Sequence, residues 1–155
     1  MFSPVLVIGI GNEYRSDDAV GLIVVRSLKA ERLPATVCLE NDGDGTSLME
    51  TWKDAGKVIL IDVTSSQAPP GTIYRFDALA SPLPATCSFP STHTFSLAEA
   101  ILMGQALDQL PASLIVYGIE GKNFSAGTSL SPEVENAVGE VVARITREIQ
   151  NSQAN

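Results

Sequence analysis

The stretch PVLVIGIGNEYRSDDAVGLIVV, residues 4–25, joins two apolar runs through a turn that is rich in glycine and acid. Pro4–Ile10 is a short, continuous apolar run ended by glycine, which is typical of a strand buried on both faces. Residues 18–33 then carry apolar side chains at helical spacing, which predicts a helix. A buried strand followed by a helix is typical of an α/β fold.

Strands and helices continue to alternate beyond this first unit. We predict further strands at residues 35–41, 57–63, 71–77 and 113–119, and we expect strand 71–77 to lie at a sheet edge. We predict helices at residues 45–56, where Gly56 closes the helix, at 94–109 and from Ser131 onward. Ser131 and Pro132 have the residue types of a helix cap and a first-turn proline. The alternation predicts an α/β three-layer sandwich whose mostly parallel, roughly five-stranded sheet is flanked by helices. We expect residues 1–150 to form a single domain and 151–155 a frayed tail.

Composition excludes several classes of protein. The 155 residues carry a net charge of −8, which disfavours nucleic acid as a partner and is compatible with cations or a basic peptide. No apolar run reaches the roughly 18 residues that span a bilayer, and the N-terminus lacks the pattern of a signal peptide. Cys38 and Cys87 do not form a CxxC pair, so we expect neither a disulfide framework nor a zinc–cysteine site. A reducing cytoplasm is the simplest location.

The turn itself does not fit a phosphate. Gly9 and Gly11 match the start of a dinucleotide-binding fingerprint, but Tyr14 occupies the position of its third glycine. The carboxylates of the turn would repel a pyrophosphate, and no GK[ST] of a P-loop follows. Asp17 is expected to cap the following helix, and Asp18 has either a helix-dipole role or a functional one.

Three residues form a candidate site. Asp18 follows the first strand, Asp62 lies at the end of strand 57–63, and His93, the only histidine, follows a long proline-rich loop. Ligands of parallel sheets bind at the carboxyl ends of strands, where these residues can converge. Two carboxylates and an imidazole suit nickel or zinc. Each residue also has a purely structural alternative. Asp18 could cap a helix, Asp62 could be a solvated acid that closes a strand, and His93 could be a core or capping histidine.

Nucleophilic catalysis by serine or cysteine is not expected. The sequence contains no G-x-S-x-G elbow. Cys87 lies six residues before His93, but no electropositive surroundings are evident that would activate its thiol.

Four segments together resemble the nickel–iron hydrogenase maturation endopeptidases: VIGIGNEYRSDDAVG, LIDVTSS, STHTFSLAEA and YGIEGKNFSAGTSLSPEVENAV. The similarity runs from about Val5 to Ile149. It implies an α/β endopeptidase that removes a C-terminal extension from the hydrogenase large-subunit precursor after nickel has been inserted. The family's catalytic, metal-contacting positions fall on Asp18, Asp62 and His93, where some members have glutamate at the first. The segment DGDG, Asp42–Gly45, resembles a family loop implicated in substrate recognition.

The resemblance implies that Asp18, Asp62 and His93 engage nickel carried by the precursor, which signals that loading is complete. Water activation stays open between a carboxylate base and metal polarisation. We expect a monomer whose loop 77–92 helps to select the precursor. One rival hypothesis is a nickel-binding chaperone or checkpoint protein without catalysis. Another is a small-molecule hydrolase or nucleotide-binding module on the same fold.

Overall fold

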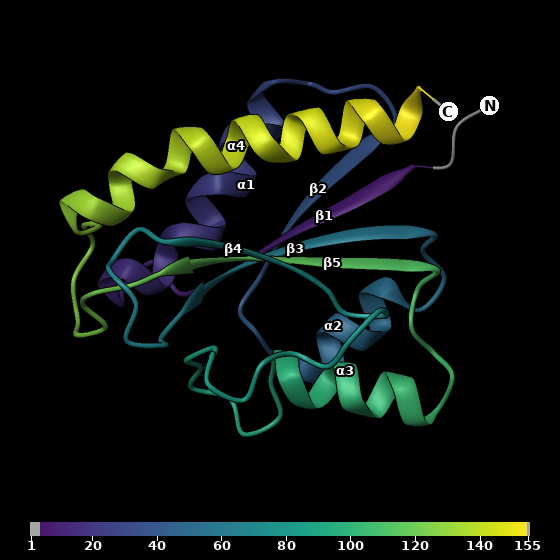
Figure 1. Cartoon of the computed structure of the whole chain (residues 1–155), viewed down its shortest axis with the longest axis horizontal. Coiled ribbons are helices and arrows are strands. Elements are labelled where there is room, and N and C mark those ends of the chain that lie inside the picture. The colour runs from purple at the N-terminus through teal and green to yellow at the C-terminus, as the bar shows by residue number, and fades with distance from the viewer. Residues whose placement is uncertain (1–3, 155) are drawn as a thin grey trace.

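The computed structural model describes residues 4–154 and contains one five-stranded sheet (Figure 1). The strand order is β2-β1-β3-β5-β4, in which β4 alone is antiparallel to its neighbour. The strands are β1 Val5–Ile10, β2 Thr36–Asn41, β3 Lys57–Thr64, β4 Ile73–Asp77 and β5 Ser113–Glu120. The predicted mostly parallel sheet and the placement of residues 71–77 at an edge are therefore confirmed.

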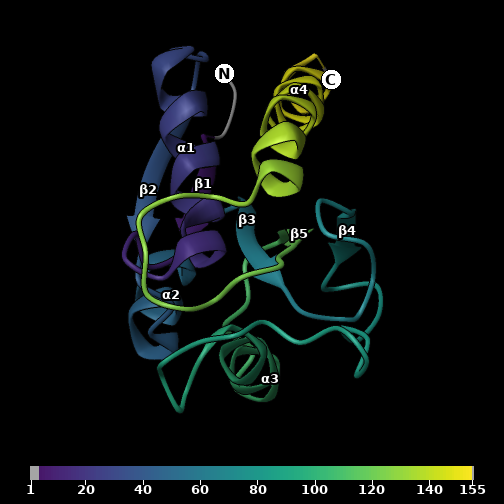
Figure 2. The same ribbon diagram turned by 90° about the vertical axis from the view of Figure 1, so that its left-hand side faces the viewer.

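Helices cover both faces of the sheet. They are α1 Val20–Ala30, α2 Gly45–Trp52, α3 Leu97–Ala106 and α4 Pro132–Gln153, with a 3₁₀ turn, η1 Ser16–Ala19, before α1. Figure 2 shows α1 and α4 on one side of the sheet and α2 and α3 on the other. The predicted three-layer sandwich is confirmed.

Each face of the sheet has its own hydrophobic core, because successive side chains of a strand point to opposite faces. On β3, Ile59, Ile61 and Val63 pack in the core that includes α1 and α4 residues, whereas Val58 and Leu60 pack with Trp52 of α2 and Leu97 of α3. The central strand is thus buried on both faces, which explains its uninterrupted aliphatic sequence.

Several predicted helix boundaries are corrected by the structure. The helix predicted at 18–33 is divided into η1 and the shorter α1. Helix α2 ends at Trp52, four residues before the Gly56 that was expected to close it, and α3 begins at Leu97 after the N-cap Ser96. Helix α4 continues to Gln153, so Asn151–Gln153 belong to the helix and not to a frayed tail; residue 155 lies outside the described residues.

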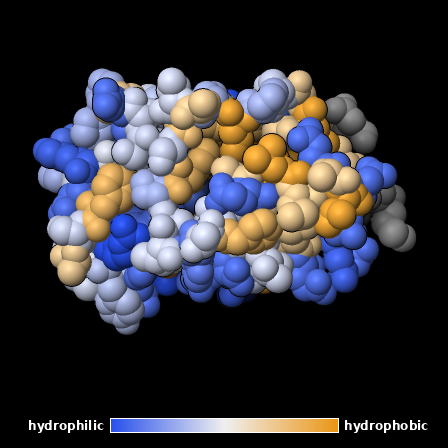
Figure 3. Space-filling model, turned by 90° about the horizontal axis from the view of Figure 1, so that it is seen from below, coloured by the Kyte–Doolittle hydropathy of each residue, from blue (hydrophilic) through white to orange (hydrophobic). Residues whose placement is uncertain are grey.

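The outer surface of α3 is unusually apolar. Leu102, Met103 and Leu107 are exposed on or just after this helix. The view from the α3 side shows hydrophobic side chains gathered on that face of the molecule (Figure 3). Within residues 4–154, no helix has both the length and the apolarity required to cross a membrane.

Candidate functional site

Glycines allow the turn after β1 to pack tightly between strands. A Cβ on Gly11 would lie 2.2 Å from the carbonyl oxygen of Asp18. A Cβ on Gly21 would lie 2.2 Å from the carbonyl oxygen of Ile10 and 2.5 Å from that of Ile61. No side chain fits at either position, because these distances are far below van der Waals contact. The two glycines therefore serve close packing of η1 and α1 against β1 and β3, and not the approach of a phosphate.

Asp17 fastens this turn to a distant loop. Its carboxylate accepts hydrogen bonds from the backbone N–H groups of Lys122, Asn123 and Ser131 and from the Ser131 hydroxyl, at 2.7–2.9 Å. The side chain is fully buried. Burial by itself would raise the pKa of Asp17, but these hydrogen bonds outweigh it and hold the pKa below its usual value.

The prediction that Asp17 caps the following helix is therefore wrong. The N-cap positions of η1 and α1 are Arg15 and Ala19, and neither helix has a side-chain capping hydrogen bond at its N-terminus. The prediction for α4 is confirmed: Ser131 stands at its N-cap and Pro132 lies in its first turn. The Ser131 side chain makes no capping hydrogen bond, and its hydroxyl donates to Asp17. The Asp17 carboxylate instead anchors a loop that is over 100 residues away in the chain. No local sequence pattern indicates this role.

Asp18 and Asp62 lie close together at the carboxyl ends of β1 and β3. Both are buried, with 5% and 3% of their surface exposed. Asp18 forms an ion pair with Arg15 at 3.2 Å, and Asp62 accepts a hydrogen bond from the N–H of Val63 at 2.8 Å. Because carboxylates next to each other and out of water disfavour ionisation, this pair has the perturbed electrostatics of functional sites.

The pKa values of the pair follow from these surroundings. Burial raises the pKa of Asp18, and the Arg15 guanidinium offsets part of that rise. Burial and then the charge of Asp18 raise the pKa of Asp62 well above its usual value, against the smaller effect of the Val63 N–H. Both carboxyl groups of the pair therefore resist ionisation more than a solvated carboxyl group does.

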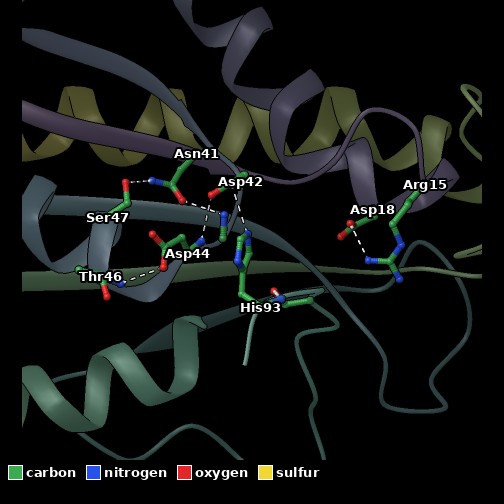
Figure 4. Close-up of polar contacts among 10 residues, drawn as sticks. Arg15, Asp18, Asn41, Asp42, Asp44, Thr46, Ser47 and His93 are labelled. Carbon is green, nitrogen blue, oxygen red and sulfur yellow. Dashed lines mark hydrogen bonds and ion pairs between the residues drawn. The ribbon is translucent and has the colours of Figure 1, made fainter. Parts of the chain in front are cut away.

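The side chain of His93 is directed toward Asp42 and not toward the Asp18–Asp62 pair (Figure 4). His93 lies in the loop before α3, three residues ahead of the N-cap Ser96, because the helix predicted from residue 94 begins only at Leu97. Its Nε2 atom is 3.3 Å from Oδ2 of Asp42, and its ring is partly exposed. Figure 4 shows the imidazole directed toward Asp42, while Asp18 is directed toward Arg15.

A short turn after β2 supports the histidine. Gly43 has a φ of +93°, which is unfavourable for other residues, and a Cβ there would lie 4.0 Å from the His93 ring. The N–H of Gly45 donates to the carbonyl of Phe95 at 2.8 Å, which ties the turn to the His93 loop. Asp44 caps α2 by accepting from the N–H of Thr46. The segment 42–45 thus positions both Asp42 and the histidine loop.

The structure therefore brings together two of the three predicted site residues. Asp18 and Asp62 are neighbours, and His93 lies at the same carboxyl-end rim but is paired with Asp42. Within residues 4–154, no group of three or more His, Cys, Asp or Glu side chains is arranged to hold a metal ion. The predicted convergence of all three residues into one ready metal-binding group is not seen in this arrangement.

A pocket of about 470 Å³ opens at this rim. It is lined by the β1 turn, the end of β2 and the His93 loop, including Glu13, Arg26, Glu40, Asp42 and His93. The Arg26 guanidinium binds Glu40 at 2.9 Å and Glu13 at 3.4 Å. Three carboxylates against one guanidinium leave the pocket with an excess of negative charge.

The end of β5 contributes a further buried carboxylate that sequence reasoning missed. Glu120 accepts hydrogen bonds from the hydroxyl groups of Thr64 and Ser66 and from the backbone N–H of Ser66. Burial, and then the nearby charge of Glu120, raise the pKa of the Cys87 thiol. A thiol held neutral is a poor nucleophile, which agrees with the expectation that cysteine does not act as one.

The chain is similar to known proteins over almost all of its length. Residues 22–148 match the family model described as hydrogenase maturation protease, a span that contains Asp62 and His93 and begins after Asp18. The coenzyme F420 hydrogenase subunit delta of Methanothermobacter thermautotrophicus is 28% identical, with 94% of each chain covered. The hydrogenase 2 maturation protease of Escherichia coli is 24% identical, with 96% of this chain and 92% of the other covered.

The fold is also found among solved structures. A hydrogenase maturating endopeptidase from Escherichia coli superimposes with a TM-score of 0.77 at 22% identity, covering 96% of this chain and 93% of that one. An α/β sandwich with paired acids at its carboxyl rim, combined with these similarities, defines a peptidase. The chain belongs to the hydrogenase maturation protease family.

Proposed function

We propose that this maturation peptidase removes the C-terminal extension of a hydrogenase large-subunit precursor once nickel has been inserted. The observation that carries the proposal is the buried Asp18–Asp62 pair beside an acidic pocket, in a chain of the hydrogenase maturation protease family. Relatives named as a hydrogenase subunit and a hydrogenase 2 maturation protease support hydrogenase as the substrate class.

The precursor's nickel serves as the recognition signal in this proposal. Carboxylate oxygens and a neutral imidazole are donors that nickel accepts, so Asp18, Asp62 and His93 form a chemically suitable set. The nickel belongs to the substrate, and its contact with these residues would place the scissile bond at the pocket. A carboxylate of the pair would act as general base, or the nickel would polarise the carbonyl or water.

His93 must change its partner for this contact. Its imidazole is held 3.3 Å from Asp42 at the pocket wall, while the two carboxylates lie deeper beside β3. We propose that the arriving nickel draws the imidazole from Asp42 toward the two carboxylates. Asp42 then holds the histidine at the rim until a loaded precursor arrives.

The long connection between β4 and α3 is proposed to help select the precursor. Most residues of its 83–91 segment, together with His93 and the start of α3, line a second pocket of about 520 Å³. We further propose that the enzyme acts as a monomer in the cytoplasm. Exchanging residues 77–92 between related enzymes should change which precursor is cut; unchanged specificity would contradict the selection role.

A processing assay tests the function. Purified protein is mixed with nickel-loaded and nickel-free precursor, and loss of the C-terminal extension is followed by mass spectrometry. We expect cleavage of the loaded form only, lost in Asp18→Ala, Asp62→Ala and His93→Ala. The matched control is Asp54→Ala, because Asp54 is an exposed carboxylate beyond the end of α2.

Three results would change the proposal. Equal cleavage of both precursor forms would remove nickel as the signal. Binding of the loaded precursor without cleavage would favour a checkpoint role for this chain. Cleavage that survives all three substitutions would place the catalytic groups elsewhere.

A further inference from the structure

The edge strand β2 runs directly into the acidic pocket. It is the end strand of the sheet and is hydrogen-bonded to β1 on one side. Figure 2 shows β2 at one edge and β4 at the other. Its last residues, Glu40 and Asn41, line the pocket together with Asp42 and His93. A chain paired with β2 would therefore be led to the candidate site.

The outward-facing groups of β2 can be assigned. Ala35 and Asn41 accept hydrogen bonds through their carbonyl oxygens from Val5 and Gly11, on the β1 side. Backbone groups of a strand alternate in direction from residue to residue. The odd-numbered residues of β2 therefore face β1, and the N–H and C=O groups of Thr36, Cys38 and Glu40 face outward. This is an accessible template for another extended chain.

The same edge carries exposed apolar side chains. Val37 and Leu39 are 47% and 40% exposed, although they belong to a strand. Cys38 packs against the core on the α1 and α4 side, so its two neighbours project on the α2 and α3 side. There they adjoin Leu6 and Ile8, their register partners on β1. They form an apolar shelf beside the outward-facing backbone groups.

The opposite edge is better protected. On β4, Arg75 forms an ion pair with Glu148 at 2.8 Å. Phe76 packs edge-to-face against Phe89, which brings the long loop before α3 to this strand. Charged side chains and covering loops are common means of preventing unwanted strand pairing. On β2 the one charged side chain is Glu40, which is already bound by Arg26.

We infer that an extended segment of the substrate protein adds to the sheet along the outer edge of β2, as a sixth strand that carries the scissile bond into the pocket. Strand addition supplies affinity through the main chain and specificity through alternate side chains. The occupant should carry apolar side chains over Val37 and Leu39. It should carry a basic side chain where it meets Glu13, Glu40 and Asp42. The inference rests on the proposed function for the identity of the substrate.

A proline at position 38 tests the outward backbone directly. Cys38→Pro removes one outward N–H and keeps the bonds to β1, which is the arrangement in which edge strands tolerate proline. The matched control, Cys38→Ala, keeps the N–H. We expect KM for precursor processing to rise about tenfold in Cys38→Pro relative to Cys38→Ala, with kcat unchanged, as for loss of one backbone hydrogen bond.

The outcomes separate the two proposals. If the wild type cuts the precursor and both variants have the same KM, strand addition is wrong and the proposed function stands. If the wild type cuts no precursor, the proposed function fails. Should Cys38→Pro not fold, amide exchange measured by NMR on Asp62→Asn with and without precursor decides instead. Slower exchange at Thr36, Cys38 and Glu40 supports the inference, and unchanged exchange at these amides overturns it.

Discussion

Asp17 and Asp18 are adjacent in the chain and lie in the same short turn, yet their surroundings differ sharply. Asp17 accepts four hydrogen bonds from the loop before α4, and its pKa is lowered. Asp18 has an ion pair with Arg15, lies beside a second buried carboxylate, and has a raised pKa. The two side chains are buried to nearly the same extent. Their hydrogen-bond and charge partners, and not their depth, therefore account for the opposite pKa shifts.

The difference shows how a structural carboxylate is distinguished from a candidate functional one. A buried carboxylate with a full set of donors stabilises the folded state in its ionised form. A buried carboxylate beside another acid is costly to ionise, and such an arrangement is common at functional sites. The comparison predicts that substitutions of Asp17 affect stability, and that substitutions of Asp18 affect activity.

The largest expected effect on folding comes from Asp17→Asn. The amide group cannot accept from all four donors, and it leaves part-buried backbone N–H groups of the 121–131 loop without their acceptor. We expect the free energy of unfolding to fall by about 3 kcal/mol, which chemical denaturation would measure. The carboxylate of Asp17 would have no special structural role if this variant were as stable as Asp18→Asn.

For Asp18 and Asp62 we expect the opposite result, a large loss of activity without a loss of stability. Asp18→Asn and Asp62→Asn remove costly buried charge, so unfolding free energy at neutral pH should be unchanged or higher. Processing of the loaded precursor should fall by about 100-fold or more in kcat/KM, as for loss of a catalytic acid–base group. Asp54→Asn is the surface control. A stable variant with full processing activity would exclude that carboxylate from the reaction.

Glu148 on α4 extends the comparison to a carboxylate outside the candidate site. Burial raises its pKa, but hydrogen bonds from Arg75 and Tyr117 and the charges of Arg75 and Lys57 outweigh burial and lower it. Because the folded-state pKa is below the usual 4.5, the stabilisation is present above about pH 4.5 and is lost as the pH falls through the folded-state value.

Glu148→Gln should therefore lower the free energy of unfolding by about 2 kcal/mol at pH 7, and by less near pH 3. Denaturant unfolding of both proteins across this pH range measures the difference. If the two proteins differ in unfolding free energy by the same amount at both pH values, packing of the side chain, and not its charge, stabilises the fold.

The smallest effect is expected at Arg15. Its guanidinium is partly exposed, and it is 3.2 Å from the Asp18 carboxylate. Arg15→Met removes a charge that keeps Asp18 ionised, and processing should slow by about threefold, in keeping with a solvent-screened pair. Arg144→Met, which breaks an exposed pair with Glu140 on α4, should leave the rate unchanged. Equal losses in both variants would show that the Arg15 effect is not specific to the site.

Prediction from sequence succeeded where the information is local. The aliphatic run Val58–Ile61 identified the central strand, because only a strand covered on both faces is apolar at every position. The cap and first-turn proline at Ser131 and Pro132 located the start of α4. Predicted helix ends were less accurate, since Gly56 and the 94–96 segment belong to loops whose conformation depends on contacts with other parts of the chain.

In the candidate site, too, only the features set by local sequence could be predicted. Asp18 and Asp62 could be placed side by side from sequence, because they follow parallel strands whose carboxyl ends meet at one edge of the sheet. The pairing of His93 with Asp42 could not, because it joins a turn after β2 to a loop before α3 through side chains alone. Asp17 was misassigned as a helix cap for the same reason.

The sequence by itself determined that this protein is an α/β sandwich with two acids at one rim, since hydrophobic periodicity and strand direction are properties of short segments. Only the tertiary structure decided which acid is enclosed by hydrogen-bond donors and which lies beside a second carboxylate at the carboxyl-end rim. That distinction depends on the hydrogen-bond donors that surround each carboxylate. For Asp17, those donors come from residues more than 100 positions away in the chain.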